Sequence, residues 1–500
     1  MMIEEKMNLD HGNNNTTRRR LLRAGLLGAL AVPARYSFGA NDGKTGSVEI
    51  SAVTLALADY VAQASQKALP PQALEATKHH LLDTLAAMIS GTHLLAGEKA
   101  IAYIKAQGGT AQACIPGTNL LTTVVNASLA GGMLAHADET DDSHPASLTH
   151  PGAGIVPAAL AMAEFEKSSG TDLLRSVALG YDICARLSFS LGAYAFSRRG
   201  HGTHSFGPMF GATVACASLA KLTPQQVRFT LSYTTQQASG LSNYARDTEH
   251  VEKAFQFGGL PARNGAASVT MVASGMSGID DPFGGPSNFF VAFGGADPKP
   301  EELTRDLGSR YEVINTAIKR WTVGSPIQAA LDSVYDLMLT HRFKVSDVEQ
   351  VTVRIFKTGA ATVNNRSMPD INMQYMVAVM LLDGTASLEA AHDVKRMTHP
   401  EVLEIKKRVE LIGDDELQKA LPSRQAIVDI KLKDGRVLHS HTKNVRGTAA
   451  NPMTRDEVGK KAYDLCAPVL GQDKARSLVA AIWDLEQVTN VQSLRSWLQT

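Results

Sequence analysis

The spacing of hydrophobic residues changes twice along this chain of 500 residues. From about residue 50 to 300 they recur every three or four positions, which is typical of helices. Several of these runs are apolar almost all round, which indicates helices buried in a large bundle. From about 315 to 445 short runs alternate hydrophobic with polar residues, as half-buried strands do, and after Thr454 the helical spacing returns. This order predicts a mainly α-helical fold with an inserted α+β domain.

The clearest strand signal lies near the end of the inserted region. Residues 428–433 and 436–438 alternate in polarity and are separated by Asp434-Gly435. An Asp-Gly pair between two such runs favours a hairpin with a two-residue type I′ turn. A helix-rich body with an inserted second domain has a cleft between its parts, and small-molecule sites are often found in such clefts.

The composition narrows the possible functions. The chain has 49 basic and 49 acidic residues, and 44% of its residues are hydrophobic. Disorder as the main state is excluded, because disordered chains are poor in apolar residues and rich in net charge. A balanced charge also argues against a nucleic-acid partner, which needs a basic surface. Residues 1–39 hold six bases and three acids, so the remainder carries 43 bases against 46 acids, a net charge of −3.

The basic N-terminus resembles an export signal. Thr17-Arg-Arg-Arg-Leu-Leu-Arg23 precedes a short apolar stretch, residues 24–32, in the order of a secretory signal. Arg18 and Arg19 match the pair of a twin-arginine (Tat) signal, and residues 37–39 offer a cleavage site. This interpretation predicts a periplasmic or exported protein with no stable membrane association after export. A disordered basic tail or a membrane-touching helix are the alternatives.

The four cysteines are far apart in the sequence and show no CxxC spacing. They are Cys114, Cys184, Cys216 and Cys466. Each lies in an apolar stretch, so we expect buried free thiols.

The segment richest in chemistry runs from His136 to His150. Within fifteen residues it holds four carboxylates and three imidazoles: Asp138, Glu139, Asp141, Asp142, His136, His144 and His150. Such a loop can bind a divalent metal, supply paired acid and base groups, or cap helix termini. Composition alone leaves these three uses open.

The same segment resembles the signature of the MmgE/PrpD family. The matching residues are His136-Ala-x-Glu139-x-Asp141-Asp142-Ser143, then His150-Pro151-Gly152. Further matches follow in family order: Gly180-Tyr181-Asp182, His204-Ser-Phe-Gly207, Glu252-Lys253, Lys319-Arg320-Trp321 and Gln374-Tyr375. The resemblance therefore covers nearly all of the chain after the N-terminal signal.

The resemblance implies an architecture and a chemistry. The family includes 2-methylcitrate dehydratase, cis-aconitate decarboxylase and iminodisuccinate epimerase, which mostly act on di- and tricarboxylates without a metal or organic cofactor. It implies a homodimer whose large all-helical domain is built from both chain ends, with a smaller α+β lid domain. The expected segments are residues 1–40 (signal and disordered N-terminus), 48–314 (large domain), 315–445 (lid domain) and 446–500 (C-terminal helices of the large domain).

Candidate site residues follow from the chemistry, which needs a base, an acid and cations for carboxylates. By resemblance, His150 and His204 are the acid/base pair, with His201 as a fallback. Glu139 and Asp142 would orient the imidazoles. The candidates for binding substrate are Ser143, Lys253, Lys319, Arg320 and, more weakly, Arg263. Lys253 is also a candidate catalytic residue. Tyr375 would contact these residues rather than the substrate.

One departure from the family bears on the reaction. Where many members have a histidine shortly after the Lys-Arg pair, this chain has Gly324. Because of this change, we expect dehydration, hydration or epimerisation rather than decarboxylation. The expected function is a cofactor-independent lyase or isomerase that removes a proton α to a carboxylate. A metal-dependent hydrolase using the 136–150 loop, or a non-catalytic periplasmic carboxylate-binding protein, are the alternatives.

Overall fold

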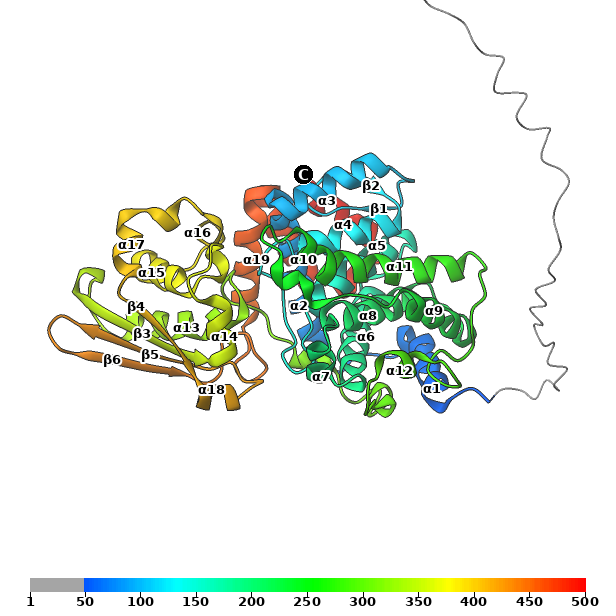
Figure 1. Ribbon diagram of the computed structural model, residues 1–500. Helices are drawn as coiled ribbons and strands as arrows, with labels where there is room; N and C mark the ends of the chain where they lie inside the picture. Colours follow the sequence, from blue (N-terminus) through cyan, green and yellow to red (C-terminus); the bar gives the residue numbers. More distant parts are fainter. Residues whose placement is uncertain (1–48) are drawn as a thin grey trace, which may run out of the picture. The chain divides into compact units, whose positions relative to one another are not determined.

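The computed structural model describes residues 49–500. The signal expected in residues 1–40 lies outside the described residues. The described chain confirms the expected fold class, a large helical domain with a smaller α+β domain (Figure 1). Among residues 49–500, no helix is both long enough and apolar enough to cross a bilayer.

The large domain begins with a series of helices separated by short loops. They are α1 (Ala52–Gln63), α2 (Pro71–Ser90), α3 (Leu95–Gln107), α4 (Val124–Ala135), α5 (Pro151–Phe165), α6 (Gly170–Ser190), α7 (Ala193–Arg198), α8 (Thr203–Leu219), α9 (Pro224–Gln237), α10 (Val251–Ala254), α11 (Leu260–Ala273) and α12 (Phe289–Phe293). A short hairpin, β1 (Ala113–Cys114) with β2 (Leu121–Thr122), precedes α4. Hydroxyl side chains cap several helix starts, as Thr123 does for α4 and Ser169 for α6.

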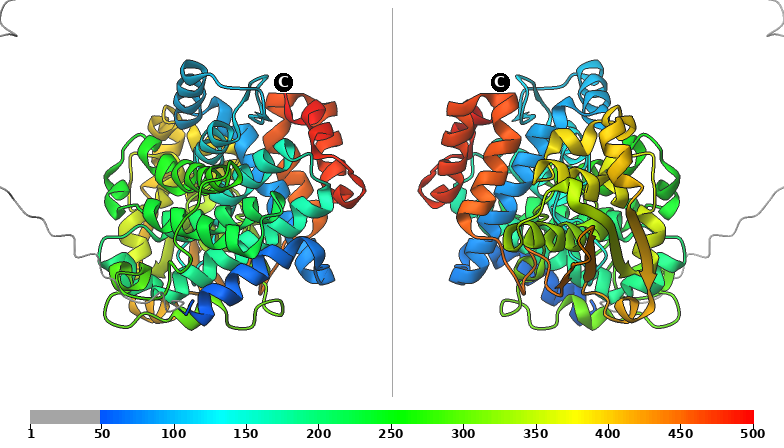
Figure 2. Two further views of the ribbon diagram at one scale, coloured as in Figure 1. Left: turned by 90° about the vertical axis from the view of Figure 1, so that its right-hand side faces the viewer. Right: turned by 90° about the vertical axis from the view of Figure 1, so that its left-hand side faces the viewer.

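The last helices of the chain return to the large domain. They are α19 (Arg455–Leu470), α20 (Gln472–Trp483) and α21 (Arg495–Leu498). Their buried residues Leu465, Leu478 and Leu498 belong to the same hydrophobic core as Leu57 and Leu81 near the other end. Figure 2 shows these helices beside the N-terminal ones in both views. The large domain is therefore built from both chain ends.

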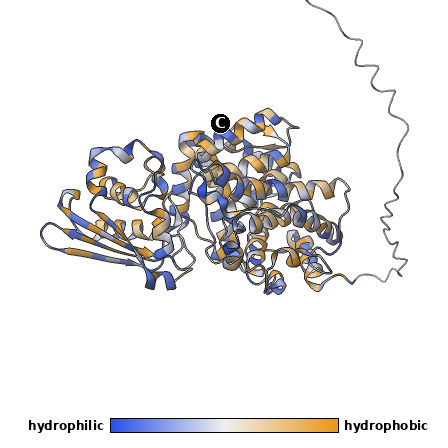
Figure 3. Cartoon of the chain, viewed as in Figure 1, coloured by the Kyte–Doolittle hydropathy of each residue, from blue (hydrophilic) through white to orange (hydrophobic). Residues whose placement is uncertain are grey.

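The small domain contains one mixed sheet of four strands in the order β4-β3-β5-β6. The strands are β3 (Val348–Phe356), β4 (Val409–Asp414), β5 (Ala426–Leu432) and β6 (Val437–Thr442). β3 pairs in parallel with β4 and antiparallel with β5, which pairs antiparallel with β6. Hydrophobic and hydrophilic residues are interleaved along these strands, as Figure 3 shows.

Helices of the small domain supply the other half of a separate core. They are α13 (Ser325–Thr340), α14 (Lys357–Val363), α15 (Met373–Asp383), α16 (Leu388–His392), α17 (Pro400–Lys406) and α18 (Asp415–Lys419). Val334 of α13 and Tyr375 of α15 pack in one cluster with the strand residues Val351, Val353 and Ile355. Each domain thus has its own core, and the candidate site is built from the segments that join them.

The predicted hairpin is present, but its turn differs from the prediction. Lys431 pairs with Val437, and the Leu432 N–H donates to the Arg436 carbonyl, so three residues form the loop. Only Gly435 has a positive φ, of 90°. A type I′ turn needs positive φ at two residues, whereas a three-residue loop needs it once and also matches the strand twist. The type I′ prediction is therefore wrong.

The four cysteines are free and buried, as expected.

Candidate functional site

The helices α4 and α5 present two imidazoles at their facing ends. His136 is the C-terminal cap of α4, and His150 is the residue before α5, with Pro151 at its first position. Asp141, in the loop between them, accepts hydrogen bonds through Oδ2 from Nδ1 of both histidines, at 2.9 and 3.0 Å. A carboxylate only accepts, so both Nδ1 atoms carry hydrogen. Asp141 is fully buried, so this orientation is firmly held.

Phe257 forms the aromatic centre of the histidine cluster. Its ring stacks on His136 and His204, with centroids 4.3 and 4.0 Å apart, and meets His150 edge-on at 5.3 Å. Phe257 lies on a π-helical turn, η4 (Phe255–Gly259), which joins α10 to α11. Such turns insert a residue into a helix and recur at functional sites.

Two glycines allow this turn to reach the end of α4. A Cβ on Gly258 would lie 2.0 Å from the Gly132 carbonyl oxygen, and a Cβ on Gly132 would lie 2.3 Å from the Gly258 carbonyl oxygen. Because both obstacles are backbone, neither can move aside as a side chain does. The two glycines therefore bring His136 and Phe257 into stacking contact.

Two lysines surround Glu139 beside the histidines. Lys253 Nζ forms an ion pair with Glu139 Oε1. Lys319 Nζ lies 3.6 Å from Glu139 Oε2 and 3.4 Å from Asp141 Oδ1, and it donates to the Glu139 carbonyl at 2.8 Å. Lys319 reaches this place because Ala317 pairs through its backbone with Ser143, which fixes the interdomain segment against the loop.

The carboxylates of the cluster are ionised at neutral pH. Burial raises the pKa of Glu139, but the ammonium groups of Lys253 and Lys319 hold it well below its usual range. Burial likewise opposes ionisation of Asp141, whose pKa is nevertheless well below normal because two imidazoles and Lys319 face it.

Three imidazoles of the cluster, those of His150, His204 and His250, are neutral at neutral pH. Burial lowers the pKa of His150 to about 4, against the opposing effect of Asp141 and with help from Lys319. Burial and neighbouring cationic groups also hold the pKa values of His204 and His250 well below normal. The described cluster therefore offers bases, and an acid must come from elsewhere.

The small domain contributes a carboxyl group that retains a proton. Asp370 lies on the 3₁₀ turn η8 (Pro369–Ile371) and is buried. Burial, followed by the charges of Glu139 and Asp138, raises its pKa to about 7. Its carbonyl accepts the backbone N–H of Gly324 at 2.9 Å, so Asp370 lies beside the position where many family members have the histidine.

A second small-domain group, His392, faces the loop as well. Its Nδ1 lies 2.7 Å from the Leu388 carbonyl and therefore carries hydrogen. Its Nε2 lies 3.4 Å from Asp138 Oδ2. Together with Asp370, it brings the small domain against the acidic end of the loop.

Asp142 is a structural carboxylate in a different cluster. His80 Nδ1 and the Tyr181 hydroxyl donate to its Oδ2 at 2.8 and 2.7 Å, and the Gly152 N–H donates to Oδ1 at 3.0 Å. Asp142 thus holds the first turn of α5, which positions His150, and it does not touch His150 or His204 as expected for an orienting residue.

The structure does not bring three of the predicted residues to the cluster. The Arg320 guanidinium lies 4.6 and 4.4 Å from the rings of Trp321 and Tyr335, and 3.6 Å from Asp332. Arg263 lies over Phe255 and donates to Asn264, on the outer side of α11. Tyr375 is buried in the core of the small domain and donates to the Ala390 carbonyl.

The other predicted residues lie at or near the cluster. His204 lies 3.4 Å from the Tyr244 hydroxyl, whereas the fallback His201 stacks on Phe196 at 4.4 Å. Ser143 is buried and lines a cavity between the domains.

The residues of the site that the sequence did not single out are Asp141, His136, His250, Phe257 and Asp370, and Arg424 lines the cavity between the domains. The first two lie in the quoted loop, so the loop was identified but not the roles within it. His250 and Phe257 flank Lys253 by three and four residues, and that spacing on a helix was an available signal. Asp370 and Arg424 are far away in the chain and gave none.

Two trios within the described residues have the donors of a metal site. One comprises His136, Glu139 and His250, and the other His136, Asp141 and His150, each with ligand atoms within 4.8 Å of one another. Nε2 of both His136 and His250 is buried without a hydrogen-bond partner among residues 49–500. Against this, the lysines already pair with Glu139, and Asp141 already accepts two imidazole N–H groups.

Comparison with known proteins gives this geometry a context. Residues 55–301 match the MmgE/PrpD N-terminal domain, and residues 321–487 match the C-terminal domain. The chain belongs to the MmgE/PrpD family. Within this family, it is 25% identical over 482 residues to the cis-aconitate decarboxylase-like protein oryM of Aspergillus oryzae, which covers 90% of this chain and 98% of that protein.

Two more members of the MmgE/PrpD family show the same breadth of similarity. The cis-aconitate decarboxylase of Aspergillus terreus is 22% identical over 477 residues, covering 89% of this chain and 95% of that protein. The human cis-aconitate decarboxylase is 22% identical over 450 residues, covering 86% and 91%. All three relatives are named as decarboxylases or decarboxylase-like proteins. The expectation that decarboxylation ranks below dehydration, hydration or epimerisation therefore finds no support.

Proposed function

We propose that this protein is a lyase that acts on a small polycarboxylate by proton transfer at a carbon next to a carboxylate. The observation that carries the proposal is the pair of imidazoles held by Asp141 beside the Lys253–Glu139–Lys319 cluster. Neutral imidazoles supply a base, and the lysines supply positive charge for substrate carboxylates. Membership of a family with decarboxylase relatives supports the same class.

The proposed base is His150. Its Nδ1–H is held by Asp141, so Nε2 is free to accept a proton, and its pKa of about 4 keeps it neutral above that pH. The proposed acid is Asp370, whose pKa of about 7 allows it to carry a proton near neutrality. The environments of His150 and Asp370 reverse the usual order of their pKa values, and such a reversal is typical of acid–base pairs in catalysis.

This pair serves either candidate reaction. In a dehydration, the base takes the proton from carbon while the acid protonates the departing hydroxyl as water. In a decarboxylation, the C–C bond breaks to release CO2, its electron pair remains on carbon, and the acid delivers a proton there. Asp370, whose carbonyl accepts the Gly324 N–H, would supply this proton.

The test is a panel of carboxylic acids that includes cis-aconitate and citrate, incubated with the enzyme in D2O. Proton NMR would follow deuterium incorporation, loss of substrate and the appearance of products, and CO2 release would be measured in parallel. We expect exchange or turnover for at least one polycarboxylate and a loss of at least 100-fold for His150→Ala. The absence of exchange and turnover across the panel contradicts the proposal, and binding without either favours a non-catalytic carboxylate-binding protein.

A metal-dependent hydrolase is the second candidate, because Nε2 of His136 and His250 has no partner among the described residues. Elemental analysis of the purified protein and activity after chelation decide between the two. Stoichiometric metal together with chelator-sensitive hydrolysis would establish this alternative over the lyase.

We further propose that the protein is exported in folded form and acts as a homodimer. The basis is the twin-arginine pattern at Arg18 and Arg19 and the family resemblance. Fractionation of a bacterial host with a twin-arginine pathway should find the wild type, but not the variant with both arginines changed to lysine, in the periplasm. Light scattering of the purified protein should give about twice the mass of one chain.

A further inference from the structure

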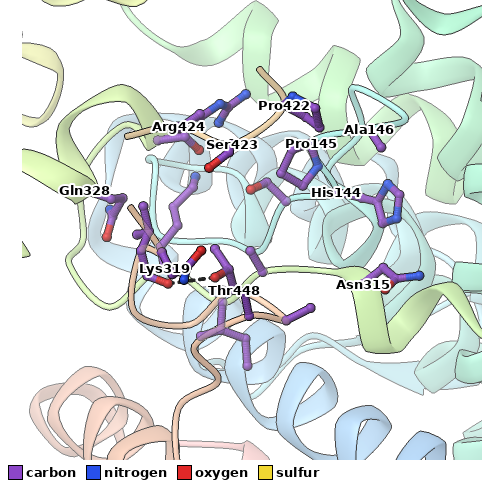
Figure 4. A pocket seen from close by; sticks show the side chains of 18 of the residues that line it. His144, Pro145, Ala146, Asn315, Lys319, Gln328, Pro422, Ser423, Arg424 and Thr448 are labelled. Carbon is purple, nitrogen blue, oxygen red and sulfur yellow. Dashed lines mark hydrogen bonds between the residues drawn. The ribbon is translucent and has the colours of Figure 1, made fainter. Parts of the chain in front are cut away.

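A cavity of about 530 Å³ lies between the large domain and the small domain. One wall is formed by the loop and the interdomain segment, with Ser143, His144 and Lys319. The facing wall belongs to the small domain, with Ser423, Arg424 and Lys443. Figure 4 shows Arg424 and Ser423 across the cavity from Lys319 and Thr448.

Most charged groups of the cavity wall already have partners. Lys319 is held by the Glu139 carbonyl and Asp141. Glu312 pairs with His144 and Arg310, and Arg446 pairs with Glu457. The charges of Glu312 and Arg446 are compensated by these partners, whereas Lys319 faces two carboxylates only at 3.4 and 3.6 Å.

Arg424 differs from them. Within residues 49–500, its side chain forms no hydrogen bond and no ion pair, although it is only partly exposed. Burial lowers the pKa of its guanidinium. Tyr194 and Glu139 of the large domain lie near enough to oppose this shift through their charges. Removing a cation from bulk water without an opposite charge nearby raises the free energy of the folded protein. An anionic ligand bound to the cation would offset this increase.

We propose that Arg424 is the binding subsite for a second carboxylate of the substrate, reaching it from the small domain while the first carboxylate lies near Lys319. This inference rests on the proposed function, because it assigns one end of the same substrate. A guanidinium presents parallel N–H groups that match a carboxylate in a bidentate pair, and an ammonium cannot reproduce that geometry. The subsite would select acids with carboxylates at both ends over monocarboxylates.

The subsite also gives the small domain a role in recognition. Lys319 belongs to the segment that enters this domain, whereas Arg424 lies two residues before β5 within it. A ligand that touches both residues would join the loop of the large domain to the sheet of the small domain. Substrates with one carboxylate would leave Arg424 unpaired.

The experiment measures binding by calorimetry for the full-length protein, using cis-aconitate as a tricarboxylate probe and crotonate as a monocarboxylate probe. Arg424→Gln should weaken cis-aconitate binding by about 10- to 100-fold, the usual range for losing a charged hydrogen-bonded pair. Arg424→Lys should lose an intermediate amount, and crotonate binding should not change. Arg436→Gln is the matched control, because Arg436 is exposed in the same domain and pairs only with Asp434.

The outcomes separate this inference from the proposed function. Unchanged cis-aconitate affinity in Arg424→Gln, with turnover intact in the wild type, overturns the subsite and leaves the lyase standing. Equal losses for crotonate and cis-aconitate also overturn it, because they show a general disturbance of the site.

If the wild type binds cis-aconitate and Arg424→Gln does not, but no acid is turned over, the subsite stands and the lyase fails. If the wild type binds no polycarboxylate of the panel, both fail. Thermal unfolding of each variant checks that the fold is retained.

Discussion

The neighbouring carboxylates Asp141 and Asp142 have different partners and different consequences. Asp141 accepts from His136 and His150, whose Nε2 atoms remain free, whereas Asp142 accepts from His80, Tyr181 and the backbone of α5. Both side chains are fully buried. Two carboxylates one residue apart thus have separate roles: one orients the nitrogens of two imidazoles, and the other holds a helix in place.

The largest expected effect comes from Asp141→Asn. Asparagine carries no negative charge and brings an NH2 donor that can turn toward an imidazole nitrogen, so a group that only accepts no longer fixes the tautomer of His150. We expect kcat/KM to fall about 1,000-fold in the molecules that remain folded, and the free energy of unfolding should fall as well, because buried Lys319 loses a facing carboxylate. Steady-state kinetics and denaturant unfolding measure both. A variant that keeps a tenth of the activity would remove Asp141 from the site.

Asp142→Asn should lower stability but, unlike Asp141→Asn, leave catalysis largely intact. The amide leaves at least one of its three buried donors without an acceptor, so the free energy of unfolding should fall by about 3 kcal/mol. The fraction that remains folded should keep most of its kcat, because Asp142 touches neither His150 nor His204. Denaturant unfolding with activity per folded molecule checks this, and unchanged stability would contradict the structural role.

Gly258→Ala tests how the aromatic centre is held. The added methyl would meet the Gly132 carbonyl oxygen, so the π-helical turn or α4 must shift. We expect a loss of about 1–3 kcal/mol in unfolding free energy, as for other overpacked interiors, together with lower activity. Gly435→Ala in the exposed hairpin is a control for backbone strain without a nearby obstacle. Equal activity losses in the two would speak against the close approach.

The pH dependence distinguishes the proposed base from the proposed acid. His150 must be unprotonated, so kcat/KM should fall tenfold per pH unit below about 4. Asp370 must be protonated, so kcat/KM should fall tenfold per pH unit above about 7. In Asp370→Asn the rate should drop and the alkaline decline should disappear. An alkaline limb that persists in this variant would assign the acid to another group.

The smallest effect is expected for Arg320→Gln. Its guanidinium lies on two aromatic rings and beside Asp332, away from the Asp141 cluster. We expect less than a threefold change in kcat/KM and a loss of about 1 kcal/mol in stability from the stacking. A tenfold rise in KM would return Arg320 to the substrate-binding residues.

Local patterns in the sequence predicted much of the fold. The helical spacing, the alternation in β3 and β5, and the Asp-Gly turn each depend on residues close together in the chain. The turn type was missed because Asp434-Gly435 fits both a two-residue and a three-residue loop. The loop of residues 136–150 was found in the same way, because its polar residues are consecutive.

The division of roles within the site was not predictable in that way. Asp141 and Asp142 look alike in sequence, and only their neighbours from α2, α4, α5 and α6 separate them. Arg320 follows Lys319 directly, yet the two side chains point to different surroundings. Asp370 and Arg424 reach the site through the fold of the small domain, and no local spacing connects them with His150.

One contact at the end of the chain has a consequence for synthesis. Lys461 of α19 donates to the Thr140 carbonyl and pairs with Asp83 of α2. The backbone of the loop is therefore tied down by a residue that the ribosome adds after more than nine-tenths of the chain. Domains begin to fold from their N-terminal parts during translation, but the loop gains this contact only after α19 has emerged. A polypeptide terminated before α19 would contain His136, Asp141 and His150 and still lack one of the contacts that hold the segment carrying them, so the last helices contribute to assembling the site.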